Sequence, residues 1–223
     1  MRSAGKGVPE VVSITDLTHD GRGVAKTDGK TVFVDGALPG ETVRMVRMKR
    51  RRSLDEARTE EVIEASPDRT QPGCEHFGMC GGCSLQHLTA DAQLRAKDNL
   101  LHEDLSRIGG VEARERFAPV AGPAWADRRR ARLGARMVEG KGRVLVGFRE
   151  KFKPFVADIK ACPVLAEPAG TLIEPLSALL TGLSIARRVP QVEVCVADNR
   201  TALVIRVLDE PSTEDLAALR GFQ

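Results

Sequence analysis

The sequence has no long apolar run and few aromatic residues. No stretch approaches the roughly 18 consecutive apolar residues that span a membrane, so we expect no membrane partner. The first residues, MRSAGKGVPEVVSI, lack an apolar segment followed by a small-residue cleavage site, which argues against a secretory signal. Tyrosine is absent and Trp125 is the single tryptophan. These absences predict a cytoplasmic protein that makes few aromatic stacking contacts.

A strong excess of one charge is also missing. The chain has 34 Lys and Arg against 31 Asp and Glu, a formal net charge of +3. This excess does not by itself indicate a polyanionic partner, so the positions of the basic residues matter more than their number. With 223 residues and an apolar fraction of 42%, the chain can form one large domain or two small ones.

The first part of the chain, residues 8–66, is predicted to form a small β-barrel. About five short β-prone runs alternate with turn signals there. Asp28-Gly29 separates GVAKT from KTVFV, and Asp-Gly between two such runs is the favoured two-residue hairpin turn. Simple alternation in ETVRMVRMKRRR predicts Val43 and Met45 on one face and Arg44 and Val46 on the other. The polar segment 66–73, with its Pro and Gly, predicts a domain boundary.

The remaining residues, 67–223, are predicted to form an α+β domain. A helical segment and linker are expected within residues 89–125, with Thr89 as the N-cap and Gly109-Gly110 as the stop. The apolar residues of this helix share one face, at Leu94, Leu101, Leu105 and Ile108.

Two hairpins and two shorter helices are predicted further along. The first hairpin spans residues 128–150 with its turn at EGKG, and the second joins QVEVCVA to TALVIRVL across DNR. A helical stretch is interrupted or restarted near Pro175. Ser212 and Asp215 form a capping-box pattern before a helix of about two turns.

Three of the five cysteines form a tight C-x5-C-x2-C triplet, Cys74, Cys80 and Cys83. Gly81-Gly82 lies inside the triplet, and glycine allows a tight turn because positive φ carries no Cβ penalty. In a reducing cytoplasm such a group indicates metal or redox chemistry more than disulfides. The triplet supplies three ligands, and a four-ligand site needs one more. The spacing alone favours zinc and an iron–sulfur cluster equally.

Several residues are candidates for the missing ligand. Cys162 stands directly before Pro163, which biases it toward extended geometry, and a Cys-Pro pair is a common neighbour of iron–sulfur ligands. Cys195 lies in an alternating strand pattern and is expected to be a small buried apolar residue. His76 and His87 are alternative ligands for zinc.

The motifs taken together resemble one family. CEHFGMCGGCSLQHL is followed, in order, by QLRAKDNLL, RRRARLG, GFRE and KACPVL. This arrangement is similar to that of the S-adenosylmethionine-dependent RNA (uracil-5-)-methyltransferases, especially the bacterial 23S ribosomal RNA enzymes. The resemblance implies that residues 8–66 are a TRAM domain, a small OB-like RNA-binding barrel. It also implies a [4Fe–4S] cluster bound by Cys74, Cys80, Cys83 and Cys162.

Two basic stretches are the candidate RNA contacts. The first ends a predicted barrel strand, where a loop can hold phosphates, and comprises Lys49, Arg50, Arg51 and Arg52. The second is a predicted strand with an apolar face and a basic face, the latter formed by Arg130, Arg132 and Arg136. The plainer interpretation of the second stretch is an ordinary exposed basic strand. With few aromatic residues, phosphate contacts are expected to dominate binding.

No methyl-donor site or catalytic residue can be assigned in these residues. GRGVAK and GKGRVL begin like a glycine-rich fingerprint, but neither has the third glycine or opens a helix after a strand. The resemblance implies that a Rossmann-like domain, with the S-adenosylmethionine site and the catalytic cysteine, lies beyond the residues present here.

We therefore expect the RNA-binding and iron–sulfur portion of a 23S rRNA (uracil-5-)-methyltransferase, inactive by itself, with structured RNA as its partner and no obligate protein partner. A non-catalytic RNA-binding module with a structural zinc site and a fragment of a tRNA (uracil-5-)-methyltransferase are the alternatives.

Overall fold

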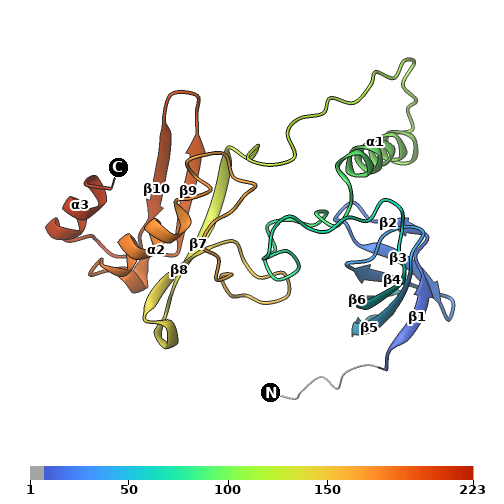
Figure 1. The fold of residues 1–223 in the computed structure, drawn as a ribbon, viewed down its shortest axis with the longest axis horizontal. Coiled ribbons are helices and arrows are strands. Elements are labelled where there is room, and N and C mark those ends of the chain that lie inside the picture. Colours follow the sequence, from blue (N-terminus) through green and yellow to red (C-terminus); the bar gives the residue numbers. More distant parts are fainter. Residues whose placement is uncertain (1–7, 223) are drawn as a thin grey trace. The chain divides into compact units, whose positions relative to one another are not determined.

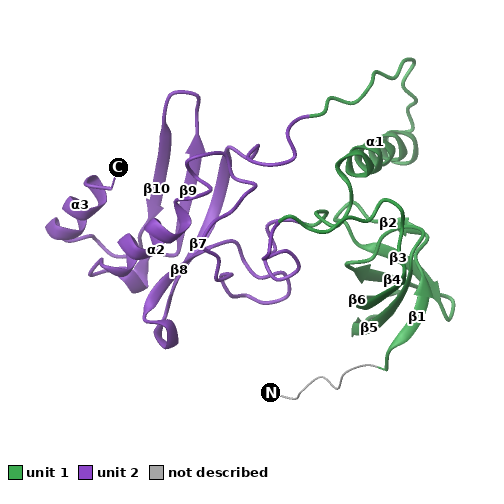
Figure 2. Cartoon of the chain, viewed as in Figure 1, with its two compact units in different colours: residues 1–73, 84–121 green, residues 74–83, 122–223 purple. Residues whose placement is uncertain are grey.

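The computed structural model describes residues 8–222, which fall into two compact units (Figures 1 and 2). The first unit comprises Met1–Gly73 and Ser84–Ala121, and the second comprises Cys74–Cys83 and Gly122–Gln223. The units therefore interleave along the chain, which differs from the single boundary predicted near residue 66. Among the described residues, no helix combines the length and apolarity that crossing a bilayer requires.

The first unit contains a curved six-stranded sheet in the order β1-β5-β6-β4-β3-β2. All neighbours in this sheet are antiparallel except β4 and β6. Residues just after the first strand hydrogen-bond to the third strand, since the Thr15 N–H donates to the Val24 carbonyl at 2.8 Å. The sheet thus curls towards a barrel. Its strands are β1 (Glu10–Ser13), β2 (Asp16–Leu17), β3 (Gly23–Thr27), β4 (Lys30–Asp35), β5 (Thr42–Arg50) and β6 (Leu54–Glu64).

Local sequence explains the predicted hairpin but not the face pattern of β5. Asp28 and Gly29 both have positive φ, 52° and 72°, as a type I′ turn requires, so the β3–β4 hairpin is confirmed. The pairing of β5 with β6 shifts between Arg44 and Met45. The extra residue at this shift is Glu60 of β6, and in β5 the consecutive residues Met45 and Val46 are both buried, so simple alternation does not hold there. The prediction that Val46 shares the outer face with Arg44 was therefore wrong.

Helix α1 (Ala90–Arg107) packs against the barrel through small side chains. Ala92 and Leu88 form a buried cluster with Leu38 of the barrel. The predicted leucine face was not the packing face, because Leu101 is 56% exposed and Ile108 is 82% exposed in the part of the chain described. The predicted N-cap, Thr89, makes no side-chain capping hydrogen bond.

The second unit is built on a four-stranded antiparallel sheet in the order β10-β9-β7-β8. Both predicted hairpins are confirmed, and the first turns through a short 3₁₀ helix, η1 (Glu139–Lys141). A single core covers one face of the sheet and includes Leu133, Val144, Leu176 and Val192. The strands are β7 (Arg130–Val138), β8 (Arg143–Gly147), β9 (Gln191–Val196) and β10 (Thr201–Arg206).

Helices complete the second unit. Helix α2 (Ile173–Thr181) packs beside β8 and starts two residues before Pro175, where the missing proline N–H costs no helical hydrogen bond. The 3₁₀ helix η2 (Ala186–Arg188) follows it. Helix α3 (Thr213–Arg220) begins with the predicted capping box, in which Ser212 and Asp215 each accept from the other's backbone N–H. These elements leave the outer face of β7 exposed at its arginines.

Candidate cysteine centre and basic surfaces

The cysteine triplet lies in a loop that is tied to the segment following β8. The Gly81 N–H donates to the Arg149 carbonyl at 2.8 Å, and the Lys151 N–H donates to the Met79 carbonyl at 2.9 Å. These two backbone hydrogen bonds place residues 74–83 in the second unit. The loop is therefore positioned by a partner about seventy residues later in the chain rather than by its own turns alone.

The two glycines of the triplet are required for close packing and not for positive φ. A Cβ at Gly81 would lie 2.9 Å from the Arg149 carbonyl oxygen, and one at Gly82 would lie 2.9 Å from a ring carbon of Phe148. Neither has positive φ, whereas Gly78 does, at 87°. The predicted physical reason for Gly81-Gly82 was therefore wrong, and the positive-φ position is Gly78.

Cys162 is buried and held through its backbone. Its N–H donates to the Gly170 carbonyl at 2.9 Å, and its own carbonyl accepts from the Leu165 N–H at 3.2 Å. A Cβ at Gly170 would lie 2.8 Å from the Cys162 carbonyl oxygen, so this turn also depends on a glycine. Cys162 belongs to the same core that Cys80 and Phe148 pack against.

The electrostatics of Cys80 show that the four predicted ligand thiols are neighbours. Burial raises the pKa of the Cys80 thiol, and the nearby thiols of Cys162, Cys83 and Cys74 raise this pKa further. The Gly82 N–H, which donates to Cys80 Sγ at 3.4 Å, acts in the opposite direction. An iron or zinc centre would act in the same direction as this N–H, because a bound cation stabilises thiolates.

The residues described do not form a closed single-ion site. No group of three or more His, Cys, Asp or Glu among residues 8–222 is arranged to hold a metal ion. His87 lies in the first unit, and His76 in the cysteine loop accepts the Cys80 N–H through its carbonyl. Cys195 is exposed on β9, so the expectation that it is buried was wrong. The assignment of cluster ligands stays a prediction.

The outer face of β7 carries the predicted row of arginines. Arg130, Arg132 and Arg136 are exposed, while the alternating Ala131, Leu133 and Ala135 are buried. Because β7 is hydrogen-bonded to β8 on one side and β9 on the other, this row is fixed in a rigid sheet.

Arg206 is a basic residue on this face that sequence reasoning missed. It is exposed, and it lies opposite Gln191, which in turn lies opposite Gly134 of β7, so it shares the face of Arg132. The sequence contains a signal for this position, because Ala202, Val204 and Arg206 alternate along TALVIR and so share one face of the strand. Glu193, 3.5 Å from Arg132, is an acidic neighbour on the same face.

The second basic surface is the tip of the β5–β6 hairpin. Its four predicted residues are all exposed, and Arg51 pairs with Glu56 at 2.8 Å. Arg47, which belongs to the same basic run, is unavailable to a ligand because its side chain is 8% exposed and paired with Glu10 at 2.8 Å and with Asp55. Among the described residues, no carboxylate forms an ion pair with Lys49, Arg50 or Arg52.

Asp55 holds this hairpin tip. Its carboxylate is 2% exposed and accepts hydrogen bonds from Lys30 Nζ at 2.7 Å, from the Arg51 N–H at 3.1 Å and from Arg47. Lys30 Nζ also donates to the Arg51 carbonyl. The hydrogen bond from Lys30, together with the other donors, lowers the pKa of Asp55 to about 2. The basic tip is thus anchored through both polar groups of the Arg51 backbone.

This anchor predicts an acid-dependent loss of stability in the first unit. Asp55 has a folded pKa of about 2, below its ordinary 3.8, so its contribution is complete above the ordinary value and is lost as the pH falls towards 2. We expect Asp55→Asn to lower the free energy of unfolding near neutral pH. The variant should also lose less stability than the wild type as the pH falls from 3.8 to about 2. Urea unfolding at a series of pH values measures this. Parallel pH profiles for the wild type and the variant would contradict the assignment.

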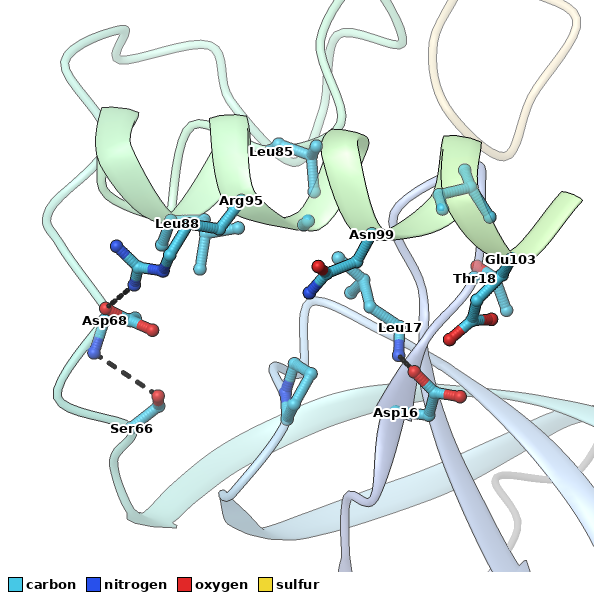
Figure 3. A pocket seen from close by; sticks show the side chains of 14 residues that line it. Asp16, Leu17, Thr18, Ser66, Asp68, Leu85, Leu88, Arg95, Asn99 and Glu103 are labelled. Atoms are coloured by element: carbon cyan, nitrogen blue, oxygen red, sulfur yellow. Dashed lines mark hydrogen bonds and ion pairs between the residues drawn. The ribbon is translucent and has the colours of Figure 1, made fainter. Parts of the chain in front are cut away.

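A cavity of about 310 Å³ lies between α1 and the barrel (Figure 3). Leu17, Leu85 and Leu88 supply apolar lining, and Asn99 and Glu103 project from the helix. The Arg95 guanidinium at its edge is paired with Asp68 at 2.8 Å. Its charged lining includes the carboxylates of Asp16, Asp68 and Glu103, so the cavity does not extend either basic surface.

Comparisons with known proteins agree with this architecture. Residues 10–45 match the TRAM domain family. The chain is 50% identical over 214 residues to the 23S rRNA (uracil(1939)-C(5))-methyltransferase RlmD of Alkalilimnicola ehrlichii, and 49% identical over 214 residues to that of Methylococcus capsulatus. In both cases the alignment covers 96% of this chain and 48% of the relative, so the chain spans about half the length of these relatives.

A solved structure shares the fold. The tRNA (uracil-54, C5)-methyltransferase of Pyrococcus abyssi, solved with S-adenosyl-L-homocysteine, aligns with a TM-score of 0.62 and 23% identity. The alignment covers 97% of this chain and 49% of that one. The chain is therefore a mixed α+β protein that carries a TRAM domain, and it shares the fold of part of this structure. Almost from end to end, its sequence is similar to about half the length of the 23S rRNA enzymes named RlmD.

Proposed function

We propose that this chain is the RNA-binding and cluster-bearing portion of an S-adenosylmethionine-dependent 23S rRNA (uracil-5-)-methyltransferase. The observation that carries the proposal is the 50% identity to an RlmD protein over 96% of the chain. The methyl donor would bind in the part of such a protein that these residues do not align with, since the alignment covers 48% of the relative. The role of the present residues is to hold structured RNA, with ribosomal RNA favoured over transfer RNA by the names of these relatives.

The proposed cluster ligands are Cys74, Cys80, Cys83 and Cys162. The proposal is supported by the thiols gathered around Cys80 and by the Gly82 N–H directed at its sulfur, since hydrogen bonds to sulfur are typical of iron–sulfur sites. A four-iron cluster is larger than one ion, so its thiolates stand further apart than the ligands of a tetrahedral zinc. When bound, the cluster would supply a cross-link between the cysteine loop and a segment 79 residues after Cys83, closing a long loop.

We expect the 223 residues alone neither to bind S-adenosylmethionine nor to methylate RNA. Among the described residues, the parallel strands β4 and β6 are joined through β5, and no strand–glycine loop–helix unit is present to hold the donor. Titration calorimetry with the donor and incubation of labelled donor with unmodified 23S rRNA measure this. Specific donor binding, or label at uracil C5, would show that a catalytic site lies within these residues.

A further inference from the structure

Arg128 stacks on an aromatic ring that packs against the cysteine loop. Its guanidinium carbon lies 5.2 Å from the centroid of the Phe148 ring. The same ring fills the space beside Gly82, where a Cβ would lie 2.9 Å from a ring carbon. Phe148 and Cys80 also pack against the core that contains Cys162. The Phe148 ring therefore contacts both the exposed Arg128 side chain and the cysteine loop.

The backbone around Arg128 is attached to the segment that carries the fourth cysteine. The Arg128 N–H donates to the Val164 carbonyl at 3.0 Å, and the Ala166 N–H donates to the Arg128 carbonyl at 3.0 Å. The Arg128 Nε reaches forward to the Arg130 carbonyl at 3.3 Å. Arg128 thus connects the beginning of the basic strand with both halves of the cysteine centre.

The stacked guanidinium keeps donors for a further ligand. Stacking uses the face of the planar group, whereas its N–H bonds lie in the plane and point outward. Among the acceptors of residues 8–222, the Arg128 guanidinium uses the Arg130 carbonyl through Nε alone, so the terminal nitrogens of this exposed side chain can donate to a phosphate. A phosphate bound there would hold the guanidinium on the ring, and the ring over the Cys80–Gly82 turn.

We propose that Arg128 is a positioning residue that couples RNA binding to retention of the iron–sulfur cluster. RNA bound along β7 fixes Arg128 on Phe148, and Phe148 then shields the cysteine centre from solvent and oxygen. Linkage makes the effect reciprocal, so the cluster in turn favours the RNA-bound arrangement of Arg128. This inference rests on the proposed function, because it requires both the cluster and binding of RNA.

The test is the rate at which the cluster is lost in air, followed by visible absorbance, with and without a saturating fragment of 23S rRNA. For the wild type we expect RNA to slow the loss by about fivefold or more, the lower end of usual coupling factors. Arg128→Ala should assemble the cluster but lose most of this protection, and Arg128→Lys should restore part of it. Phe148→Leu, which keeps an apolar side chain against Gly82, should also reduce the protection.

Arg136→Ala is the matched control, because it removes an arginine of the strand β7 that follows Arg128 and leaves the Arg128–Phe148 contact in place. It should weaken RNA binding but retain full protection once RNA is saturating. Equal protection in the wild type and Arg128→Ala, with the iron and sulfide content intact, would overturn the coupling and leave the proposed function standing. Absence of iron and sulfide, or of RNA binding, in the wild type would instead overturn the proposed function.

Discussion

Anaerobic reconstitution with iron and sulfide is expected to give a brown chain with about four iron and four sulfide atoms, and Cys162→Ser is expected to lose most of both. Cys162 is the candidate ligand that lies far from the triplet in sequence but beside Cys80 in the fold. Removing it leaves three thiols and opens the long loop that the cluster would close. Iron and sulfide analysis, together with the visible spectrum, measures the loss.

Cys195→Ser provides the control for this experiment. Cys195 is exposed on β9, opposite Arg130 and Ala202, whereas Cys162 is buried in the core that Cys80 packs against. The variant should therefore retain the full iron and sulfide content. Stoichiometric zinc without iron, after anaerobic expression in iron-replete medium, would contradict the cluster and favour the structural zinc alternative. Equal loss in both cysteine variants would instead indicate a general instability of the second unit.

Neutralising either basic surface is expected to weaken RNA binding strongly and to flatten its salt dependence. Each lost phosphate contact reduces the slope of log K against log salt by up to about 0.9, so three contacts reduce it by up to about 2.7. Between about 50 and 200 mM salt, that difference corresponds to roughly fortyfold in affinity. The two variants to compare replace with glutamine either Lys49, Arg50 and Arg52 or Arg130, Arg132 and Arg136.

The measurement is a binding titration of a structured 23S rRNA fragment at several salt concentrations. Arg107→Gln serves as the control, since Arg107 is a highly exposed basic residue of α1 outside both surfaces. Its slope should remain close to that of the wild type. Unchanged affinity and slope in both triple variants would show that RNA is held elsewhere. A loss confined to one variant would assign binding to that surface alone.

Predictions from local sequence were accurate where local chemistry determines the structure. The Asp28-Gly29 turn, the alternation of arginine and apolar side chains in β7 and the Ser212–Asp215 capping box were each visible as short patterns. Their physical causes act within a few residues, through positive φ, the two-residue period of a strand and hydrogen bonds in one helical turn.

Predictions failed where tertiary contacts override the local pattern. Helix α1 packs through Ala92 because the surface beneath it is formed by Leu38 and Leu88, which no helical period reveals. Val46 is buried next to Met45 instead of alternating with it, and Arg47 is enclosed by acidic partners from two other segments. At the cysteine centre, the need for Gly82 comes from Phe148, a residue far away in sequence. These features depend on contacts between residues far apart in the sequence, and local sequence patterns do not indicate which distant residues meet.

The interleaving of the two units has a consequence for synthesis of the chain. Cys162 follows Cys83 by 79 residues, and the whole of α1 is made in between. At roughly 5 to 20 residues per second, the ribosome needs about 4 to 16 seconds to cover that distance. The segment that contacts the cysteine loop, residues 148–151 after β8, is also made during this interval. Under the proposed ligand set, the three thiols of the triplet must therefore remain reduced and unpaired, on a nascent chain, until Cys162 is made.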